Sequence, residues 1–281
     1  MTVGICGAGT MGRGIAIAAL SAGHSVIVYD AIAGALATAQ TTIADQLAKS
    51  VEKGKMLSDE RDAALARLTI SASVDGLTTS DLVIEAIAED LEIKHALLIL
   101  LEGICKPDAI ITSNTSSISI TALAACLKSP ARFAGLHFFN PAHIMKLVEV
   151  VRGTLTSEAT ITACVDFAKG LGKTPIVAKD VPGFVVNRVA RNFYNEAQRI
   201  VMENAASIPQ VDTLMKALGF KMGPFELMDL IGVDVNLDVT KSMYAGYFNE
   251  PRFNPSLLQQ QYIDAGLHGR KTKKGFYDHD E

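Results

Sequence analysis

The chain has 281 residues, of which 49% are hydrophobic and 20% are charged, a composition typical of a compact soluble protein with one large or two modest domains. A net charge of −4 gives no reason to expect nucleic acid as a partner, and no apolar run reaches the roughly 18 residues that a membrane-spanning helix requires. The four cysteines are far apart and form no Cys-x-x-Cys pair, so we expect neither a disulfide framework nor a metal site, and a cytoplasmic location fits best.

The first two thirds of the chain alternate short β-branched runs with longer segments of helical periodicity. The segment Thr2–Cys6 resembles a strand and lies so close to the N-terminus that we expect no signal or transit peptide. Strands are predicted at Val3–Cys6, Ser25–Tyr29, Leu68–Ser71, Leu82–Glu85, Ala109–Ser113, Arg132–Phe138, Leu147–Val151 and Pro175–Ala178. Helices are predicted between several of them, at Met11–Ala22, Ala35–Lys53 and Leu91–Ile104. This alternation predicts an α/β fold with a Rossmann-type, parallel, doubly wound sheet and helices on both faces.

The pattern changes in the segment KDVPGFVVNR at residues 179–188, where Pro182 and Gly183 interrupt it. No convincing strand follows this point. Helices are predicted instead at Phe184–Asn204, Pro209–Leu218, Pro224–Leu230 and Val233–Tyr247. The sequence therefore predicts two domains, an α/β domain over residues 1–182 and a smaller all-α domain over residues 183–281.

A glycine-rich turn, GAGTMG at residues 7–12, follows the first predicted strand and opens the first predicted helix. In such a G-x-G-x-x-G turn, Gly7 permits the tight bend, Gly9 lets the backbone approach a pyrophosphate, and Gly12 lets helix and strand pack closely. N–H groups at the start of the helix would meet the phosphates. The motif predicts a dinucleotide site that contains Gly7, Gly9, Thr10, Met11 and Gly12. A glycine turn without a ligand, or an FAD site, would also account for the motif alone.

An acidic residue, Asp30, stands at the end of the second predicted strand. At this position a carboxylate binds the hydroxyls of the adenosine ribose, and it repels the 2′-phosphate of NADP. No arginine follows directly in the segment YDAIAGA. We therefore expect NAD as the cofactor, with NADP less favoured.

The segment GLHFFNPAHIMKLVEVV at residues 135–151 places His137 and Glu149 in mostly apolar surroundings. If the strands on either side of residues 139–146 are neighbours, these two side chains can meet. A carboxylate that holds one imidazole nitrogen would let the other take the proton of an alcohol during hydride transfer. The alternative is a core histidine bonded to backbone and a glutamate on an exposed strand face. His143, in the loop between the strands, is expected at the surface.

Polar residues follow the apolar segment AIITS, beginning at Asn114 and including Ser116. Because ligands bind beyond the carboxyl ends of strands in an open α/β sheet, these side chains could reach a substrate oxygen. They could instead cap a helix that begins near Ile118. Asn187 stands at the junction of the two predicted domains, where pockets often form, although an exposed asparagine early in a helix is an equally simple interpretation.

Together these segments resemble the L-3-hydroxyacyl-CoA dehydrogenases, and most closely the short bacterial 3-hydroxybutyryl-CoA type. The resemblance extends from Val3 to Tyr277 with compatible spacings. It rests on the motifs GAGTMG at 7–12, SNTSS at 113–117, HFFNP at 137–141, KLVEV at 146–150, PGFVVNR at 182–188, GPFELMDLIG at 223–232 and KTKKGFYD at 271–278. The resemblance implies an NAD-dependent enzyme that interconverts (S)-3-hydroxyacyl-CoA and 3-oxoacyl-CoA, with short acyl chains expected.

The resemblance also implies roles for individual residues. His137 would be the catalytic base with Glu149 as its partner, and Ser116 and Asn187 would contact the substrate and orient the reacting oxygen. Further contacts to the cofactor would come from Glu89, Lys94, Asn114, Asn140 and Lys271. Lys53 matches a position that contacts the CoA phosphates, whereas Gln46 replaces a serine of the family. In the tail, KTKKGFYD departs from the commoner KTGRGFYDY.

Other functions remain open on the sequence alone. A gulonate- or carnitine-type dehydrogenase would share the first motif, although it usually has a pattern closer to HPxNP in place of HFFNP. A β-hydroxyacid dehydrogenase, which relies on a lysine, would leave the His–Glu pair unexplained. An NAD-binding protein without catalysis would be expected to have lost some of the catalytic residues, yet all of them are present.

A homodimer formed through the helical domain is also expected. This small domain carries many apolar residues, among them Phe225, Leu227, Met228, Leu230, Ile231 and Leu237. A two-fold interface is the common way to cover such a surface, and the family resemblance agrees.

Overall fold

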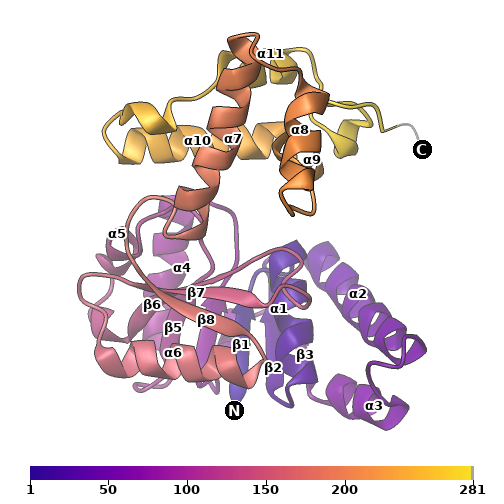
Figure 1. Cartoon of the computed structure of the whole chain (residues 1–281). Helices are drawn as coiled ribbons and strands as arrows, with labels where there is room; N and C mark the ends of the chain where they lie inside the picture. The colour runs from indigo at the N-terminus through magenta and orange to yellow at the C-terminus, as the bar shows by residue number, and fades with distance from the viewer. Residues whose placement is uncertain (280–281) are drawn as a thin grey trace. The chain divides into compact units, whose positions relative to one another are not determined.

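The computed structural model describes residues 1–279, which divide after Val181 into two compact units, residues 1–181 and residues 182–279 (Figure 1). The first unit is an α/β layer structure, and every segment that it uses as a strand was predicted as one. The second unit is built from helices. The predicted fold class, a Rossmann-type sheet followed by a smaller helical domain, is confirmed. Within the described residues, no helix is both long and apolar enough to cross a membrane.

The first unit contains one eight-stranded sheet with the order β3-β2-β1-β4-β5-β6-β7-β8. Its strands are β1 Thr2–Cys6, β2 Ser25–Tyr29, β3 Leu68–Ser71, β4 Leu82–Glu85, β5 Ile110–Ser113, β6 Phe133–Phe138, β7 Leu147–Arg152 and β8 Thr174–Lys179. The order reverses between β1 and β4, which are neighbours in the sheet although β2 and β3 separate them in the sequence. Such a switch point is where doubly wound sheets bind ligands.

One pair of neighbouring strands departs from the all-parallel sheet that the sequence predicted. β6 and β7 run antiparallel, whereas the other neighbours in the sheet are parallel. The connection over residues 139–146 contains no helix, and a parallel crossover requires a dozen or more residues. The chain therefore turns back on itself, and β7 and β8 run against the rest of the sheet.

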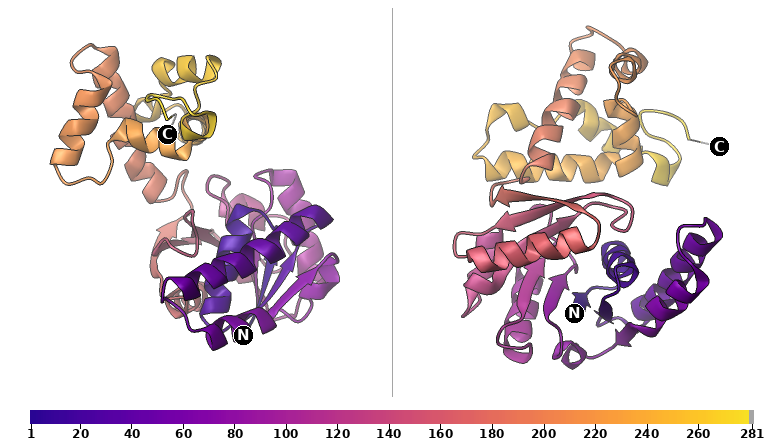
Figure 2. Two further views of the ribbon diagram at one scale, coloured as in Figure 1. Left: turned by 90° about the vertical axis from the view of Figure 1, so that its right-hand side faces the viewer. Right: turned by 60° about the horizontal axis from the view of Figure 1, so that its bottom comes forward.

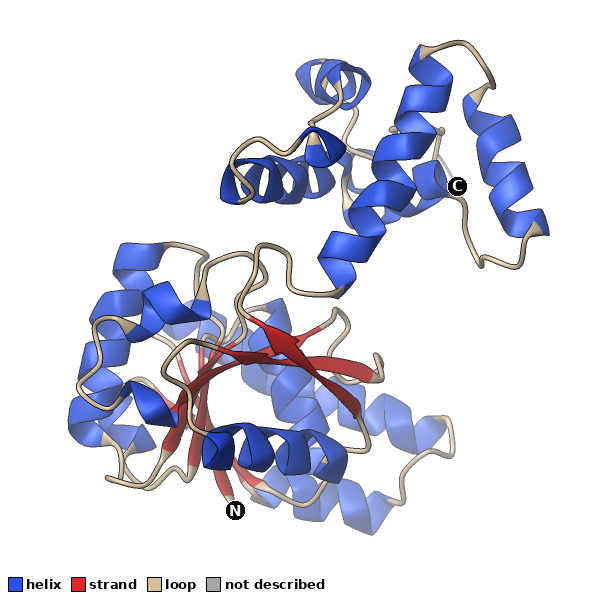
Figure 3. Ribbon diagram, turned by 60° about the vertical axis from the view of Figure 1, so that its left-hand side comes forward, coloured by secondary structure: helices blue, strands red, loops and turns tan. Residues whose placement is uncertain are grey.

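Helices flank the sheet on both sides (Figure 3). They are α1 Thr10–Ser21, α2 Ala33–Glu52, α3 Ser58–Ala66, α4 Leu91–Ile104, α5 Ile120–Ala124 and α6 Glu158–Gly170, with short 3-10 turns η1 Val74–Leu77 and η2 Pro130–Arg132. α1 packs against α2 and α3 (Figure 2), and its buried residues join the strands in one apolar core. Gly14 in α1 allows Ala142 of the β6–β7 connection to approach, because a Cβ at Gly14 would lie 3.1 Å from the Cβ of Ala142. α3, with the sequence SDERDAALA, was not predicted because its charged residues mask the helical period.

The second unit surrounds a core that includes Tyr194, Phe225, Met228 and Phe276. Its helices are α7 Val186–Met202, α8 Ile208–Ala217, α9 Pro224–Ile231, α10 Val233–Gly246 and α11 Leu257–Asp264, with 3-10 turns η3 Pro251–Phe253 and η4 Arg270–Thr272. The first of these helices begins two residues later than predicted, because Phe184 has a φ of 46°, outside the right-handed helical region.

Candidate active site

The glycine turn after β1 has a geometry that only glycine satisfies at two of its positions. Gly7 has a φ of 106°, and a Cβ there would lie 2.4 Å from the carbonyl oxygen of Ala86. A Cβ at Gly12 would lie 1.8 Å from the carbonyl oxygen of Gly7. Gly9 differs, since apart from Gly9 itself and the adjoining residues of the chain, no described residue places a heavy atom within 4 Å of the position that its Cβ would occupy. Gly7 and Gly12 therefore serve the turn itself, and Gly9 leaves open space above it.

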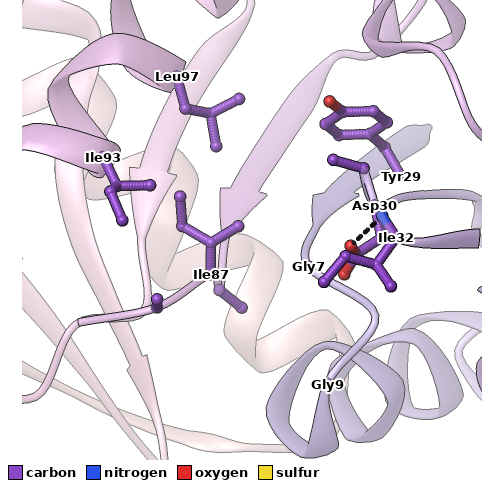
Figure 4. A pocket seen from close by; sticks show the side chains of 11 residues that line it. Gly7, Gly9, Tyr29, Asp30, Ile32, Ile87, Ile93 and Leu97 are labelled. Atoms are coloured by element: carbon purple, nitrogen blue, oxygen red, sulfur yellow. Dashed lines mark hydrogen bonds between the residues drawn. The ribbon is translucent and has the colours of Figure 1, made fainter. Parts of the chain in front are cut away.

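A cavity of about 550 Å³ opens beside this turn (Figure 4). Residues that follow three strands line it: Gly7 and Gly9 after β1, Tyr29 to Ile32 at the end of β2, and Ala86 to Ala88 after β4. Ile93 and Leu97 of α4 complete the wall. The cavity thus lies at the switch point of the sheet, where the sequence predicted a dinucleotide.

Asp30 projects into this cavity and is held in place by backbone groups. Its Oδ2 accepts a hydrogen bond from the N–H of Ala8 at 2.8 Å. Its Oδ1 accepts one from the N–H of Ile32 at 2.9 Å, which Figure 4 marks with a dashed line. The apolar side chains on the wall suit an adenine ring, and the carboxylate suits ribose hydroxyls. Among the described residues, none caps the N-terminus of α1 with its side chain, and the first turn of the helix has no acidic residue, which suits phosphates. The residues present therefore fit NAD.

Two glycine variants separate the binding role of this turn from its structural role. Gly9→Ala is expected to fold normally, because Gly9 has a φ of −70° and open space around it, but to weaken NADH binding by placing a methyl group in the phosphate region. Gly12→Ala is expected to destabilise the fold, because its methyl group would overlap a backbone oxygen. Thermal unfolding and NADH fluorescence titration measure the two effects. Unchanged NADH affinity in a folded Gly9→Ala protein would argue against a phosphate site here.

The antiparallel pairing of β6 and β7 sets His137 directly opposite Glu149. Directly opposed residues place their side chains on the same face of a sheet. The imidazole Nδ1 lies 2.8 Å from the Oε2 of Glu149, and the two residues are 6% and 0% exposed. The ring of Phe139 lies against the imidazole, with 4.5 Å between the ring centroids. The structure therefore brings the two residues together as a buried hydrogen-bonded pair.

Asn114 connects the ends of β4, β5 and β6 beside this pair. Its N–H donates to the carbonyl oxygen of Glu85 at 2.8 Å, and its Oδ1 accepts from the N–H of Phe138 at 2.9 Å. Phe138 directly follows His137, so Asn114 fixes the end of the strand that carries the imidazole. The sequence predicted that Asn114 follows a strand, but it did not predict the hydrogen bond between its side chain and Phe138.

The loop that carries Ser116 is held by Glu89, and the alternative role as a helix cap is not observed. α5 begins at Ile120, and the side chain of Ser119 caps it by accepting from the N–H of Ala122. The Oε1 of Glu89 accepts from the hydroxyl of Thr115 at 2.5 Å and from the N–H of Ser116 at 3.1 Å. The loop is therefore tied to the segment after β4.

Lys94 lies behind Glu89 and is only 1% exposed. Its Nζ is 2.6 Å from Oε1 of Glu85 and 3.2 Å from Oε2 of Glu89. Burial alone would raise the pKa of Glu89, but the charge of Lys94 and hydrogen bonds from Thr115 and Ser117 outweigh it, so that the pKa is lowered. Sequence analysis missed Glu85, although a glutamate at the end of an apolar strand, nine residues before a lysine, was a visible sign.

The remaining predicted residues lie elsewhere. Asn140 is exposed in the β6–β7 connection, and Lys53 is exposed just past the end of α2. Since α2 has 20 residues and spans about 30 Å, Lys53 stands far from Asp30 at the other end of the helix. In the second unit, Asn187 is half-buried in the first turn of α7, and Lys271 forms an ion pair with Asp234.

His143 corrects one expectation, because it is half-buried and not at the open surface. Its Nδ1 is buried without a hydrogen-bond partner among the described residues. Burial, assisted by the charge of Lys173, lowers its pKa.

Known proteins are similar to this chain in fold and in sequence over nearly its whole length. Residues 2–181 match the family model described as 3-hydroxyacyl-CoA dehydrogenase, NAD binding domain, and residues 183–279 match the C-terminal domain of the same family. The 3-hydroxyadipyl-CoA dehydrogenase of Escherichia coli is 46% identical over 99% of this chain, which covers 58% of that protein. The 3-hydroxybutyryl-CoA dehydrogenase of Bradyrhizobium diazoefficiens is 41% identical over 99% of this chain and 94% of its own length.

A solved structure, the (S)-3-hydroxybutyryl-CoA dehydrogenase of Ralstonia eutropha, is 42% identical to this chain. It superposes with a TM-score of 0.96, and the match covers 100% of this chain and 99% of the other. The likeness thus extends over both units and over nearly the full length of that protein.

Proposed function

The chain belongs to the 3-hydroxyacyl-CoA dehydrogenase family, and from this membership and the site geometry we propose that it is an NAD-dependent enzyme that interconverts (S)-3-hydroxyacyl-CoA and 3-oxoacyl-CoA. The observation that carries the proposal is the buried His137–Glu149 pair, on the same sheet whose switch point holds the Asp30 cavity. The pair offers a proton acceptor, and the cavity offers a place for the cofactor.

The proposed mechanism assigns the proton to His137. A bound NAD beside Asp30 would supply the acceptor for the hydride of the alcohol carbon. Because the Nδ1 of His137 is bonded to Glu149, its Nε2 takes the proton of the substrate hydroxyl. The ionised carboxylate of Glu149 stabilises the imidazolium that forms, so it favours the transition state over the ground state. We further propose, from the family resemblance, that Ser116 and Asn187 orient the reacting oxygen.

Three variants test this assignment. His137→Ala is expected to lower kcat by about 10²- to 10⁴-fold, the usual range for loss of a general acid–base group. Glu149→Gln keeps the shape of the side chain but removes its charge, so it is expected to lower kcat strongly and to leave NADH affinity nearly unchanged. His143→Ala is the matched control and is expected to stay close to wild type. A crippled His143→Ala protein beside an active His137→Ala protein would show that the base has been misassigned.

We propose NAD over NADP as the cofactor because of Asp30. Its carboxylate, fixed by two backbone N–H groups, would bind ribose hydroxyls and repel a 2′-phosphate. NADH oxidation with acetoacetyl-CoA is expected to be faster than NADPH oxidation at equal concentrations, and Asp30→Ala is expected to narrow the difference. Faster turnover of NADPH by the wild-type protein would contradict this role of Asp30.

The acyl group is proposed to be short, as in the 3-hydroxybutyryl-CoA dehydrogenases that this chain resembles. The 3-hydroxyadipyl-CoA dehydrogenase of Escherichia coli, at 46% identity, supports a second candidate, a longer acyl group that ends in a carboxylate. The same assay with acetoacetyl-CoA, 3-oxoadipyl-CoA and longer 3-oxoacyl-CoAs distinguishes the two. A higher kcat/KM for 3-oxoadipyl-CoA would favour the second candidate.

A homodimer formed through the helical unit is proposed from its exposed apolar surface. Phe225, Met228 and Leu237 serve the core of the unit, but Leu230 and Ile231 remain 47% and 42% exposed. Other large apolar residues of the unit are also exposed, among them Val189, Leu214, Leu218, Phe220, Val235 and Phe248. Covering such residues in a two-fold interface would remove them from water. Light scattering is expected to give about twice the monomer mass of 29.9 kDa, and a mass near 29.9 kDa would contradict the proposal.

A further inference from the structure

A row of three charged side chains, of which Glu85 and Lys94 are buried, lies behind the loop that carries Ser116. Glu85 is the last residue of β4, Lys94 lies in the first turn of α4, and Glu89 lies in the segment between them. The ammonium of Lys94 stands between the two carboxylates, 2.6 Å from Glu85 and 3.2 Å from Glu89. Lys94 therefore links the two carboxylates, because the same ammonium contacts both of them.

Glu89 divides its two oxygens between this row and the loop. Its Oε2 faces Lys94, whereas its Oε1 accepts from the hydroxyl of Thr115 at 2.5 Å, the N–H of Ser116 at 3.1 Å and the hydroxyl of Ser117 at 3.0 Å. A carboxylate that accepts three bonds on one oxygen fixes the loop only if the other oxygen is itself fixed. Lys94 supplies that restraint.

Glu85 anchors the far end of the row. Its Oε2 accepts from the hydroxyl of Ser113 at 2.5 Å, and its Oε1 accepts from the N–H of Ile87 at 2.8 Å as well as facing Lys94. Ile87 lines the cavity that contains Asp30, and Ser113 ends β5. Glu85 thus connects the wall of the cofactor cavity to the strand that precedes the Ser116 loop.

The charges of this row exceed what a simple structural ion pair requires. One ammonium faces two carboxylates: Glu85 and Lys94 are 0% and 1% exposed, whereas the side chain of Glu89 is 39% exposed. Taking charges out of water is costly, and a buried pair is weak evidence for stability. A second carboxylate therefore calls for another explanation, and its hydrogen bonds to the Ser116 loop point to one.

We infer that Glu85 and Lys94 are positioning residues, which hold the carboxylate of Glu89 so that the Ser116 loop keeps the geometry that the reaction requires. The inference rests on the proposed function, in which Ser116 contacts the substrate. It gives Lys94 a role in fixing Glu89, and it gives Glu85 a role that the sequence did not suggest. Through Ile87, the row also joins the cofactor cavity to the substrate loop.

Lys94→Met and a matched control test the inference. Lys106→Met is the control, because Lys106 forms an equally short ion pair, 2.6 Å from Asp81, at the opposite ends of β4 and α4. A displacement of about 1 Å in a reacting group can cost about 100-fold in rate. Lys94→Met is therefore expected to lower kcat by between about 10-fold and about 100-fold, with Lys106→Met close to wild type.

A double variant separates positioning from folding. Lys94→Met alone leaves the buried carboxylate of Glu85 without its cation and close to the carboxylate of Glu89, which destabilises the unit. Glu85→Gln together with Lys94→Met removes one of these charges, so thermal stability is expected to recover. kcat is expected to stay low, because Glu89 still lacks Lys94. Recovery of kcat together with stability would show that the row is merely structural and would overturn the inference.

The pH dependence of the double variant gives a second readout. The charged groups that face Glu89 are Lys94 and, through it, Glu85. Because the charge of Lys94 helps to lower the pKa of Glu89, its loss raises that pKa, and the carboxylate needed by the loop is lost as pH falls through the raised value. As the pH is lowered into the mildly acidic range, kcat of the double variant is expected to fall below its own value at higher pH. No such fall is expected for Lys106→Met over the same range.

NADH fluorescence titration of each protein completes the experiment without depending on turnover. The double variant is expected to bind NADH more weakly than Lys106→Met, because the neutral amide introduced by Glu85→Gln holds the N–H of Ile87 less firmly than the carboxylate does. If neither the wild-type protein nor Lys106→Met oxidises NADH with 3-oxoacyl-CoA, the proposed function fails. If both are active and the double variant matches them in kcat and pH profile, the inference alone fails.

Discussion

The burial of Glu149 is the constraint on which the candidate site depends. A carboxylate with no exposed surface in the middle of a sheet is unfavourable unless a partner meets it. The antiparallel register provides that partner, since His137 lies directly opposite on β6. That register in turn follows from the short connection over residues 139–146, which cannot form a crossover. The direction of β7, the burial of Glu149 and the proposed acid–base role of His137 therefore all depend on the antiparallel pairing of β6 with β7.

The other polar groups of the candidate site in the first unit lie together, at or just after the carboxyl ends of the parallel strands. They are the glycine turn after β1, Asp30 after β2, Glu85 and Glu89 at the end of β4 and after it, and Asn114 after β5. Asn114 bonds both Glu85 and Phe138 through its backbone and side chain, so the cofactor cavity and the histidine share one network. Backbone groups supply many of these bonds, which explains why so few side chains are needed to hold the site.

Much of this arrangement could be predicted from the sequence because it depends on local signals. The GAGTMG turn, Asp30 and the alternation of strands and helices are each visible in a short window, and the resemblance to one family connects them. The ion pairs of Lys94 with Glu85 and Glu89 could not be predicted from the sequence, because they depend on which side chains face inward in the folded chain. The direction of β7 was available in principle, since the length of residues 139–146 excludes a parallel crossover. α3 was missed because its apolar residues are too few to show a period.

The short connection between β6 and β7 also bears on how the site forms during folding. His137 and Glu149 are 12 residues apart, so the strands that carry them can meet as a hairpin at a small cost in loop entropy. The cofactor cavity, in contrast, requires Gly7 and Ala86, which β2 and β3 separate in the sequence, to come together. Contacts of long sequence separation form slowly, so the acid–base pair is expected to assemble before the cavity beside it.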